Sequence, residues 1–232
     1  MIGILGGMGT QAGLDFCNKL AKLNRGKLDQ QYPMFVLYNK SNTPKRPENL
    51  KKYHNVLKAL VDGCKMLEKN KCKFIVMPCN TAHYWHKDIQ KKIKIPLLSM
   101  PKEVYLHAKK TCKKKSTIGI LCTEATLKTN VYNNYFDRNF RLISPEKELQ
   151  KKSVNKAIKL VKMGKVKEAE IALRAAVKHL IRKKCKKIIL GCTELPIAIF
   201  AYKSFRKAKE SKIFIDPNLL LAEVCMKKYK RK

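Results

Sequence analysis

Short apolar runs alternate along this chain with longer stretches in which apolar residues recur every three or four positions. The short runs predict strands, and the longer periodic stretches predict helices. In the first half we predict strands over 2–5, 34–38, 74–77 and 97–100, and helices over 11–23, 50–69 and 81–92. In the second half we predict strands over 117–121, 188–190 and 212–215, helices over 127–136, 146–163 and 166–183, and a C-terminal helix. Strands bounded by helices favour an α/β fold with parallel sheets flanked by helices.

Two sequence landmarks occur twice, at nearly the same separation. Ile2-Gly3-Ile4-Leu5 recurs 116 residues later as Ile118-Gly119-Ile120-Leu121, and the apolar run that leads to Cys79 recurs 113 residues later ahead of Cys192. The similar offsets predict two homologous halves, a first domain over 1–100 plus 208–232 and a second over 101–207. In this division the C-terminal strand and helix return to the first domain. Since ligands bind at the carboxyl ends of parallel strands, we expect two pseudosymmetric domains with an active site in the cleft between them.

Each half places one cysteine between a buried strand and a helix, in the turns Pro78-Cys79-Asn80-Thr81 and Gly191-Cys192-Thr193-Glu194. The unpaired N–H groups and partial positive charge of a helix N-terminus favour the thiolate form of a cysteine. The residues after the cysteines also have backbone N–H groups that can hold a carboxylate; they are Asn80, Thr81, Thr193 and Glu194.

Two thiols that face one carboxylate site suggest a specific reaction. One thiolate removes the α-proton from one face of an amino acid, and the opposite thiol returns a proton to the other face. The outcome is racemisation, with Cys79 and Cys192 as paired acid and base. Without a cofactor, the developing carbanion is stabilised electrostatically by the N–H groups and a nearby cation.

Composition limits the class of protein further. The chain has 232 residues, of which 45% are hydrophobic, and it contains no run of the roughly 18 apolar residues that span a membrane. The N-terminus has no signal-peptide pattern, so we expect a cytoplasmic protein with no membrane partner. The nine cysteines include no pair at Cys-x-x-Cys spacing, and we therefore expect no metal site and no thioredoxin-type chemistry.

The formal net charge is +35, from 52 Lys and Arg residues against 17 Asp and Glu residues. Only eight of the 52 are Arg, and the lysines are spread along the chain without interleaved aromatic residues. Proteins that read nucleic acids use Arg for bidentate contacts and aromatic residues for stacking, so we expect no specific nucleic-acid partner. The positive field would attract an acidic substrate and would hold polyanions weakly at low salt.

The cysteine turns lie in motifs that resemble a known family. Val76-Met77-Pro78-Cys79-Asn80-Thr81-Ala82-His83 and Ile188-Ile189-Leu190-Gly191-Cys192-Thr193-Glu194-Leu195-Pro196 resemble the two signature motifs of the aspartate/glutamate racemase superfamily. Gly3-Ile4-Leu5-Gly6-Gly7-Met8-Gly9 resembles its N-terminal strand and loop, which places Met8 at the substrate. The resemblance covers essentially the whole chain. It implies a racemase that needs no pyridoxal phosphate or other cofactor, built from two similar α/β domains and usually a homodimer.

A further stretch bears on the substrate. Family members that act on aspartate have Pro-Asp-Arg-Thr after the second strand, where the Arg binds the side-chain carboxylate. The matching stretch here is Pro44-Lys45-Arg46-Pro47, so the resemblance assigns that role to Arg46. Lys45 and Pro47 depart from the pattern, although an added cation is compatible with an acidic substrate.

Other positions carry over in the same way. Val161-Lys162-Met163-Gly164 resembles the family's lysine-bearing helix end, which makes Lys162 a second carboxylate partner. Thr123 and Thr126 lie where the family has a threonine-bearing loop, and a helix cap is an equal interpretation. Glu194 stands where glutamate racemases have His, which favours the aspartate branch. For His83, one turn after Cys79, we expect a structural role.

Several alternatives stay open. The enzyme could act on glutamate or on a broader set of amino acids, or be a related maleate isomerase, which also uses two cysteines. Gly7-x-Gly9-x-x-Ala12 formally fits a dinucleotide fingerprint, but Tyr38-Asn39 occupies the place of the required acidic residue. A non-enzymatic alternative is a polyanion-binding protein on a racemase scaffold, which the charge suggests.

Overall fold

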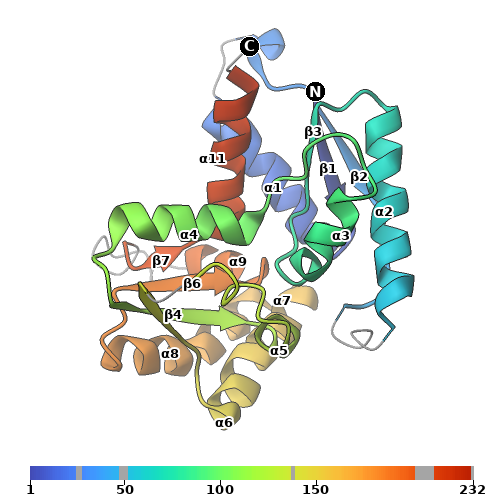
Figure 1. The fold of residues 1–232 in the computed structure, drawn as a ribbon. Coiled ribbons are helices and arrows are strands. Elements are labelled where there is room, and N and C mark those ends of the chain that lie inside the picture. Colours follow the sequence, from blue (N-terminus) through green and yellow to red (C-terminus); the bar gives the residue numbers. More distant parts are fainter. Residues whose placement is uncertain (25–27, 47–51, 137–138, 202–211, 231–232) are drawn as a thin grey trace. The chain divides into compact units, whose positions relative to one another are not determined.

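The structure is a computed structural model that describes residues 1–24, 28–46, 52–136, 139–201 and 212–230 (Figure 1). The chain divides into two compact units, Met1–Glu103 with Asn218–Lys232, and Val104–Pro217. Each unit contains a parallel sheet flanked by helices, which confirms the predicted α/β class.

The sheet of the first unit has the order β2-β1-β3, and all its strands are parallel. The central strand β1 (Ile2–Gly6) is fully buried between β2 (Phe35–Asn39) and β3 (Phe74–Val76). The predicted strand over 97–100 is wrong: it is reduced to a single bridge between Leu97 and Ile75. Helix α4 (Met100–Thr111) begins directly after it and was not predicted.

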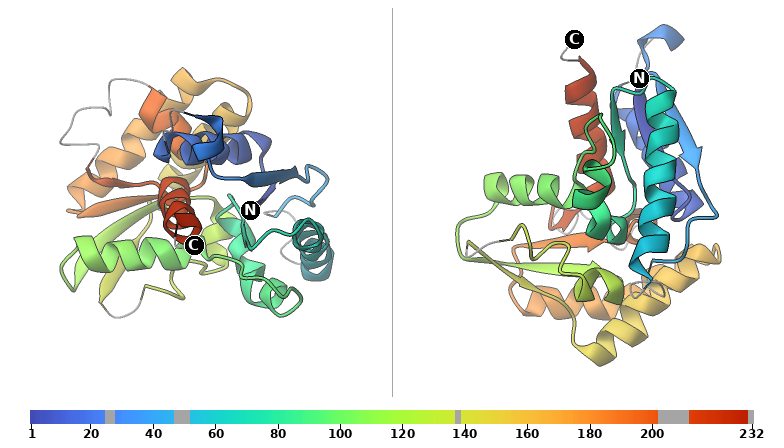
Figure 2. Two further views of the ribbon diagram at one scale, coloured as in Figure 1. Left: turned by 90° about the horizontal axis from the view of Figure 1, so that it is seen from above. Right: turned by 45° about the vertical axis from the view of Figure 1, so that its right-hand side comes forward.

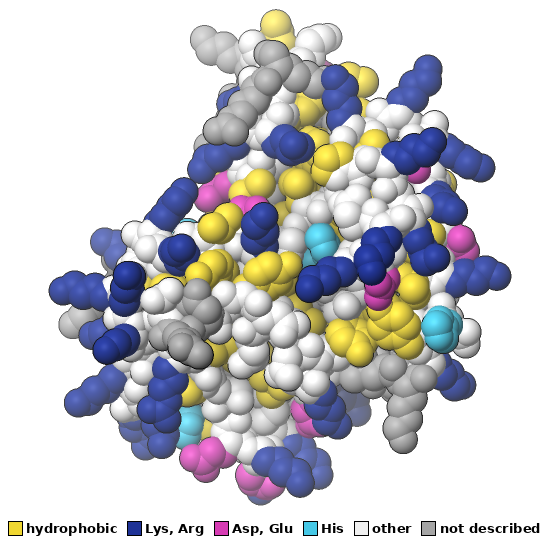
Figure 3. All heavy atoms as spheres, viewed as in Figure 1, with side chains coloured by type: hydrophobic (Ala, Val, Ile, Leu, Met, Phe, Trp, Pro, Cys, Tyr) yellow, Lys and Arg dark blue, Asp and Glu magenta, His cyan; other side chains and the backbone are white. Residues whose placement is uncertain are grey.

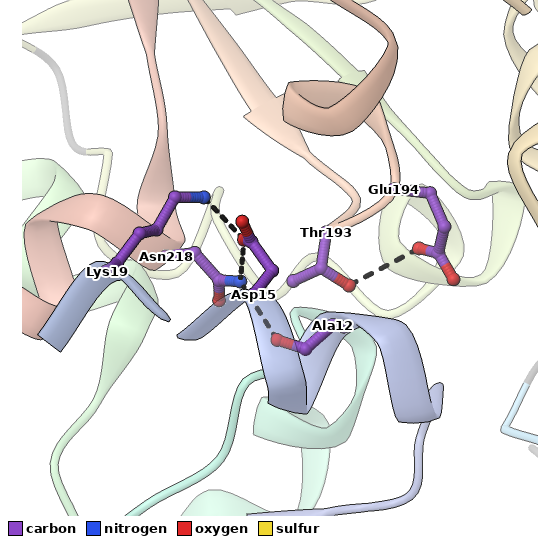
Figure 4. A network of polar contacts seen from close by, with 6 residues as sticks. All are labelled: Ala12, Asp15, Lys19, Thr193, Glu194 and Asn218. Carbon is purple, nitrogen blue, oxygen red and sulfur yellow. Dashed lines mark hydrogen bonds and ion pairs between the residues drawn. The ribbon is translucent and has the colours of Figure 1, made fainter. Parts of the chain in front are cut away.

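Helices cover both faces of this sheet because its side chains alternate between two apolar cores. Ile2 and Ile4 point to the face covered by α1 (Thr10–Leu23) and α11 (Pro217–Lys230), while Leu5 points to the face covered by α2 (Tyr53–Lys69) and α3 (His86–Gln90). Figure 2 shows α1 and α11 on one side of the three strands and α2 on the other. The buried Asn218 side chain ties α11 to α1 through hydrogen bonds to Asp15 and to the carbonyl of Ala12 (Figure 4).

The sheet of the second unit has the order β5-β4-β6-β7 and is also parallel. Its strands are β4 (Ser116–Cys122), β5 (Phe140–Ile143), β6 (Lys187–Gly191) and β7 (Phe214–Ile215). One core lies between this sheet and the helices α7 (Lys156–Lys162), α8 (Val166–Arg182) and α9 (Leu195–Ala201). We expected the C-terminal strand to return to the first half, but β7 pairs with β6.

The segment between β4 and α7 differs most from the prediction. The helix predicted over 127–136 is the short α5 (Glu124–Lys128), which ends near Asn130, where the backbone takes a φ of 51°. The single helix predicted over 146–163 is α6 (Lys147–Leu149), then a π-helix, η3 (Gln150–Asn155), and then α7. In the first unit, two 3₁₀-helices, η1 (Asp29–Gln31) and η2 (Thr81–Trp85), complete the elements described here.

The two units share one helix-to-strand connection in detail. Helix α2 is followed by Lys71 and α8 by Lys184, each with a φ of 57°. The next residue in each case sends its N–H back to the helix, Cys72 to the carbonyl of Leu67 at 3.3 Å and Cys185 to that of Leu180 at 3.2 Å. This is the hydrogen bond that closes a helix on a left-handed residue. The same local turn therefore follows α2 in the first unit and α8 in the second.

The surface reflects the composition. On the face shown in Figure 3, Lys and Arg side chains are spread over the whole surface and few carboxylates are visible. Within the described part of the chain, no helix combines the length and the apolar character needed to cross a membrane.

Gly7 and Gly164 both have left-handed backbone conformations, but only Gly7 is also crowded by neighbouring atoms. Gly7 has a φ of 85°, and a Cβ there would lie 2.3 Å from the carbonyl carbon of Lys40; Gly164 has a φ of 77°, and a Cβ there would meet nothing within 4 Å. We expect Gly164→Ala to lower the free energy of unfolding by about 1–2 kcal/mol, the cost of the backbone conformation alone. Gly7→Ala should cost clearly more, since the loop must also move. Urea denaturation of both variants measures this, and equal losses would contradict it.

Candidate active site

The first cysteine turn lies directly beyond β3. The N–H of Cys79 bonds the carbonyl of Met77 at 2.7 Å, and the 3₁₀-helix η2 begins two residues later. Cys79, Asn80 and Thr81 are all buried. The predicted order of strand, cysteine and helix is therefore present, although the first helical turns are 3₁₀ before α3 begins.

His83 holds this turn in place. Its Nδ1 lies 2.9 Å from the carbonyl oxygen of Cys79, and its Nε2 lies 3.1 Å from the backbone nitrogen of Met100. Because a carbonyl only accepts and an N–H only donates, the ring must carry its proton on Nδ1 and be neutral. Burial, together with the neighbouring His86, lowers the pKa of His83 to about 4. This contact gives His83 the structural role that we expected.

The second cysteine turn, beyond β6, contains a buried carboxylate that contacts the thiol. Cys192 Sγ donates to Glu194 Oε2 at 3.0 Å. The Thr193 hydroxyl donates to the same oxygen at 3.3 Å, the contact drawn in Figure 4. Lys162 Nζ lies 3.8 Å from the other oxygen, Glu194 Oε1. The Lys162 side chain is 58% exposed and that of Glu194 only 8%. The buried carboxylate therefore contacts an exposed ammonium group through one oxygen and the buried thiol through the other.

This arrangement corrects one expectation. We expected a helix N-terminus to favour the thiolate at Cys192, but burial raises the pKa of this thiol well above its ordinary value, and the Glu194 carboxylate raises it further. Lys162 opposes the shift and lowers the pKa. Helix α9 begins at Leu195, beyond the carboxylate, and burial together with this nearby negative charge raises the pKa of the thiol. Cys192 is therefore a thiol whose hydrogen bond points at a base.

Arg46 is fixed by backbone carbonyls of the N-terminal half. Its Nη2 donates to the carbonyl of Met8 at 2.6 Å, and its Nη1 donates to those of Pro44 at 3.1 Å and Thr43 at 3.4 Å. Its Nε is buried and has no partner among the described residues. Met8 contributes this carbonyl, while its side chain packs in the core beneath α2. Pro47 lies outside the described residues.

Thr123 begins the short helix α5. Its hydroxyl accepts a hydrogen bond from the N–H of Thr126 at 3.2 Å and lies 3.0 Å from the Thr126 hydroxyl. This is the geometry of a helix N-cap, the alternative that we considered for these two residues. A role at the substrate remains a proposal.

The structure thus groups the predicted residues within each unit. In the first unit, Arg46 contacts Met8, and Cys79, Asn80 and Thr81 share one turn. In the second, the structure brings together Cys192, Thr193, Glu194 and Lys162. Within the described residues, no three His, Cys, Asp or Glu side chains are grouped as a metal site.

Two residues near the second turn were not predicted. Gln150 donates from Nε2 to the carbonyl of Cys122, at the end of β4, at 2.8 Å. The phenol of Tyr132 is buried, and this burial raises its pKa well above the ordinary value. Neither residue belongs to a recognisable motif, so the sequence offers no signal for them.

Comparison with known proteins gives a consistent picture. The model of a family described as Asp/Glu/hydantoin racemase matches residues 5–225. The chain is 30% identical over 199 residues to the broad specificity amino-acid racemase RacX of Bacillus subtilis, which covers 84% of this chain and 86% of RacX. An aspartate racemase structure from Picrophilus torridus has 29% identity and a TM-score of 0.84, covering 100% of this chain and 94% of that one. A glutamate racemase from Thermus thermophilus has the same fold at 20% identity, with a TM-score of 0.68, covering 99% of this chain and 80% of that one.

The neutral His83 predicts a pH dependence of stability. Its pKa falls from 6.5 in the unfolded chain to about 4 in the fold, so the unfolded state binds more protons between these values and stability falls as the pH is lowered through them. Between pH 7 and pH 5 we expect the wild type to lose about 2 kcal/mol more than His83→Gln. Urea denaturation at both pH values measures the difference. His54→Gln is a control, since His54 is exposed on α2; parallel curves for wild type and His83→Gln would contradict the assignment.

Proposed function

Because the chain belongs to the Asp/Glu/hydantoin racemase family, we propose that it interconverts L- and D-aspartate without a cofactor, with Cys79 and Cys192 as acid and base. The family and the similarity to amino-acid racemases identify an amino-acid racemase. The substrate and the roles of the cysteines are the proposal. The homodimer implied by the family resemblance belongs to it as well.

The observation that carries the proposal is the contact between the Cys192 thiol and the Glu194 carboxylate. A thiol whose pKa is raised can donate a proton to a carbanion. In the opposite direction it must act as a base, and Glu194 Oε2, 3.0 Å from Sγ, can take up its proton. Such a pair supports both halves of a reversible proton transfer. Cys79 then supplies the proton transfer on the opposite face of the substrate.

The environment of Arg46 supports an acidic substrate. A guanidinium has five N–H donors, and three backbone carbonyls already orient this one through Nη1 and Nη2. The buried Nε has no partner among the described residues. We propose that this guanidinium binds a carboxylate of the substrate, since Arg and carboxylate groups pair through parallel hydrogen bonds. Lys162 stays the second proposed carboxylate partner.

A broader amino-acid specificity is the second candidate. It is favoured by the similarity to RacX and by Lys45 and Pro47, which replace the Asp and Thr of the aspartate-specific pattern. The cysteine chemistry is the same in both cases. The two candidates differ only in how strictly the substrate side chain must carry a carboxylate.

Proton NMR in D2O tests the function directly. We expect the purified protein, without pyridoxal phosphate, to remove the α-proton signal of L-aspartate while D-aspartate accumulates on chiral analysis. Exchange of glutamate or alanine at a similar rate would replace aspartate specificity by the broader one. Conversion of maleate alone would indicate an isomerase, and no turnover of any compound would contradict the proposal.

Variants of the two cysteines test the mechanism. Cys79→Ala and Cys192→Ala should each abolish racemisation. Each variant should retain deuterium exchange into only one enantiomer, because one thiol remains. Cys112→Ala is the control, since Cys112 is a partly exposed cysteine outside the motifs. Native racemisation by Cys192→Ala would exclude the two-base mechanism.

The charges around Cys192 predict opposite effects on the pH–rate profile. Glu194 raises the pKa of Cys192 and Lys162 lowers it. Glu194→Gln should therefore shift the limb assigned to Cys192 to lower pH, and Lys162→Met should shift it to higher pH. Since Glu194→Gln also removes the proton acceptor, we expect its kcat to fall about 10²–10⁴-fold. An unchanged limb in both variants would show that neither residue affects the pKa of the thiol.

A further inference from the structure

Two amide side chains of the π-helix η3 tie this helix to the end of β4. Gln150 is 3% exposed, and its Nε2 donates to the carbonyl of Cys122 at 2.8 Å and to Asn155 Oδ1 at 2.9 Å. Asn155 Nδ2 in turn donates to Glu124 Oε1 at 2.7 Å. These hydrogen bonds therefore reach the segment between β4 and α5 at two points, Cys122 and Glu124.

The two ends of this chain of hydrogen bonds fix its direction. The carbonyl of Cys122 and the carboxylate of Glu124 can only accept hydrogen bonds, so each amide must turn its nitrogen toward them. The bond between the amides then has one possible donor, Gln150 Nε2, and one possible acceptor, Asn155 Oδ1. Because no other assignment satisfies both ends, the two amides hold the two points in a single arrangement.

Thr123 lies between the two points. Cys122 precedes it and Glu124 follows it, and its hydroxyl accepts a hydrogen bond from the N–H of Thr126 at 3.2 Å as α5 begins. The amides of η3 therefore hold the turn from β4 into α5 on both sides of Thr123.

This turn begins level with the second motif cysteine. Strands β4 and β6 are parallel neighbours, and Cys122 is paired with Gly191. Each strand ends at that residue. Thr123 and Cys192 therefore leave the sheet side by side, from strands that lie about 4.8 Å apart.

The helix that carries the two amides is itself unusual. Gln150 begins η3 and Asn155 ends it, five positions apart, which is the spacing of π-helical backbone hydrogen bonds. Such turns are rare and occur frequently at functional sites. Here both amides direct a hydrogen bond out of η3, toward the segment that contains Thr123.

We propose that Gln150 and Asn155 are positioning residues for racemisation, which hold the Thr123 turn beside Cys192. They act through Thr123, the residue to which the family resemblance gives a role at the substrate. The inference rests on the proposed function and adds to it two residues that no motif indicated.

An exchange of amide and carboxylate tests the contact. Asn155→Asp keeps an acceptor for Gln150 but places a carboxylate against that of Glu124. We therefore expect the KM for aspartate to rise about tenfold while kcat changes less than about twofold. Asn155→Asp/Glu124→Gln reverses donor and acceptor, so its KM should return to within about threefold of the wild-type value. Lys152→Met is the matched control, because it removes only the exposed ion pair of η3 with Glu148.

The pH–rate profile separates positioning from proton transfer. The limb assigned to Cys192 should stay at the wild-type pH in all these variants, because Glu194 and Lys162 are unchanged. A kcat that falls at unchanged KM would show only a loss of folded protein and would overturn the proposal. A KM that Glu124→Gln does not restore, or that rises equally in Lys152→Met, would overturn it as well.

A Thr123→Ala background tests whether the amides act through Thr123. In this background Asn155→Asp should raise KM no further, because the group that it displaces is already absent. Effects of the two substitutions on KM that simply multiply would contradict the proposed route through Thr123.

Hydrogen exchange followed by mass spectrometry tests the contact without an activity readout. The amides of residues 123–129 should exchange faster in Asn155→Asp and should return to the wild-type rate in Asn155→Asp/Glu124→Gln. Equal exchange in the wild type and Asn155→Asp would overturn this inference and leave the racemase function standing. A wild type that racemises no amino acid would instead contradict the proposed function on which the inference rests.

Discussion

Both halves of the chain depend on the same packing constraint, the close approach of a cysteine to a glycine in the central strand of a covered parallel sheet. A Cβ on Gly3 would lie 3.2 Å from the sulfur of Cys72, and a Cβ on Gly119 would lie 3.2 Å from that of Cys185. A larger residue at either position would require its neighbours to move. The contact packs the segment that enters β3 and β6 against the central strand of each sheet, and the two motif cysteines lie in the turns at the carboxyl ends of these strands.

Hydrophobic periodicity predicted the regular strands and helices. It failed where a left-handed residue ends a helix, or where the position of a strand depends on pairing with a strand distant in sequence. The left-handed Asn130 follows α5, and a hydrophobic pattern does not reveal it. Strand β5 is short and carries the exposed Arg141, so it lacks the apolar run that marks a buried strand. Strand β7 was found, but its pairing with β6 depends on contacts that are not local in sequence.

The motifs likewise predicted which residues lie in the turns, but not how these residues affect one another's chemistry. They placed Cys192 and Glu194 two positions apart, but the sequence could not show that the carboxylate turns back onto the thiol and raises its pKa. Gln150 stands in a lysine-rich helical stretch and looks like an exposed polar residue. In the structure it begins the π-helix η3, is buried and donates to Asn155, and a hydrophobic pattern indicates none of this.

The raised pKa of Cys192 also shows that nearby charges affect this thiol more than the net charge of the whole chain does. A net charge of +35 should by itself favour every thiolate. Most of that charge is on exposed lysines, and beyond a screening length of about 8 Å salt removes most of their influence. A carboxylate 3.0 Å from a buried sulfur is not screened in this way, and it prevails. The exposed lysines far from the turn therefore act on encounter with anions in solution, while Glu194 and Lys162 shift the pKa of Cys192. A change of surface charge far from the turn should leave the chemistry of the thiol intact.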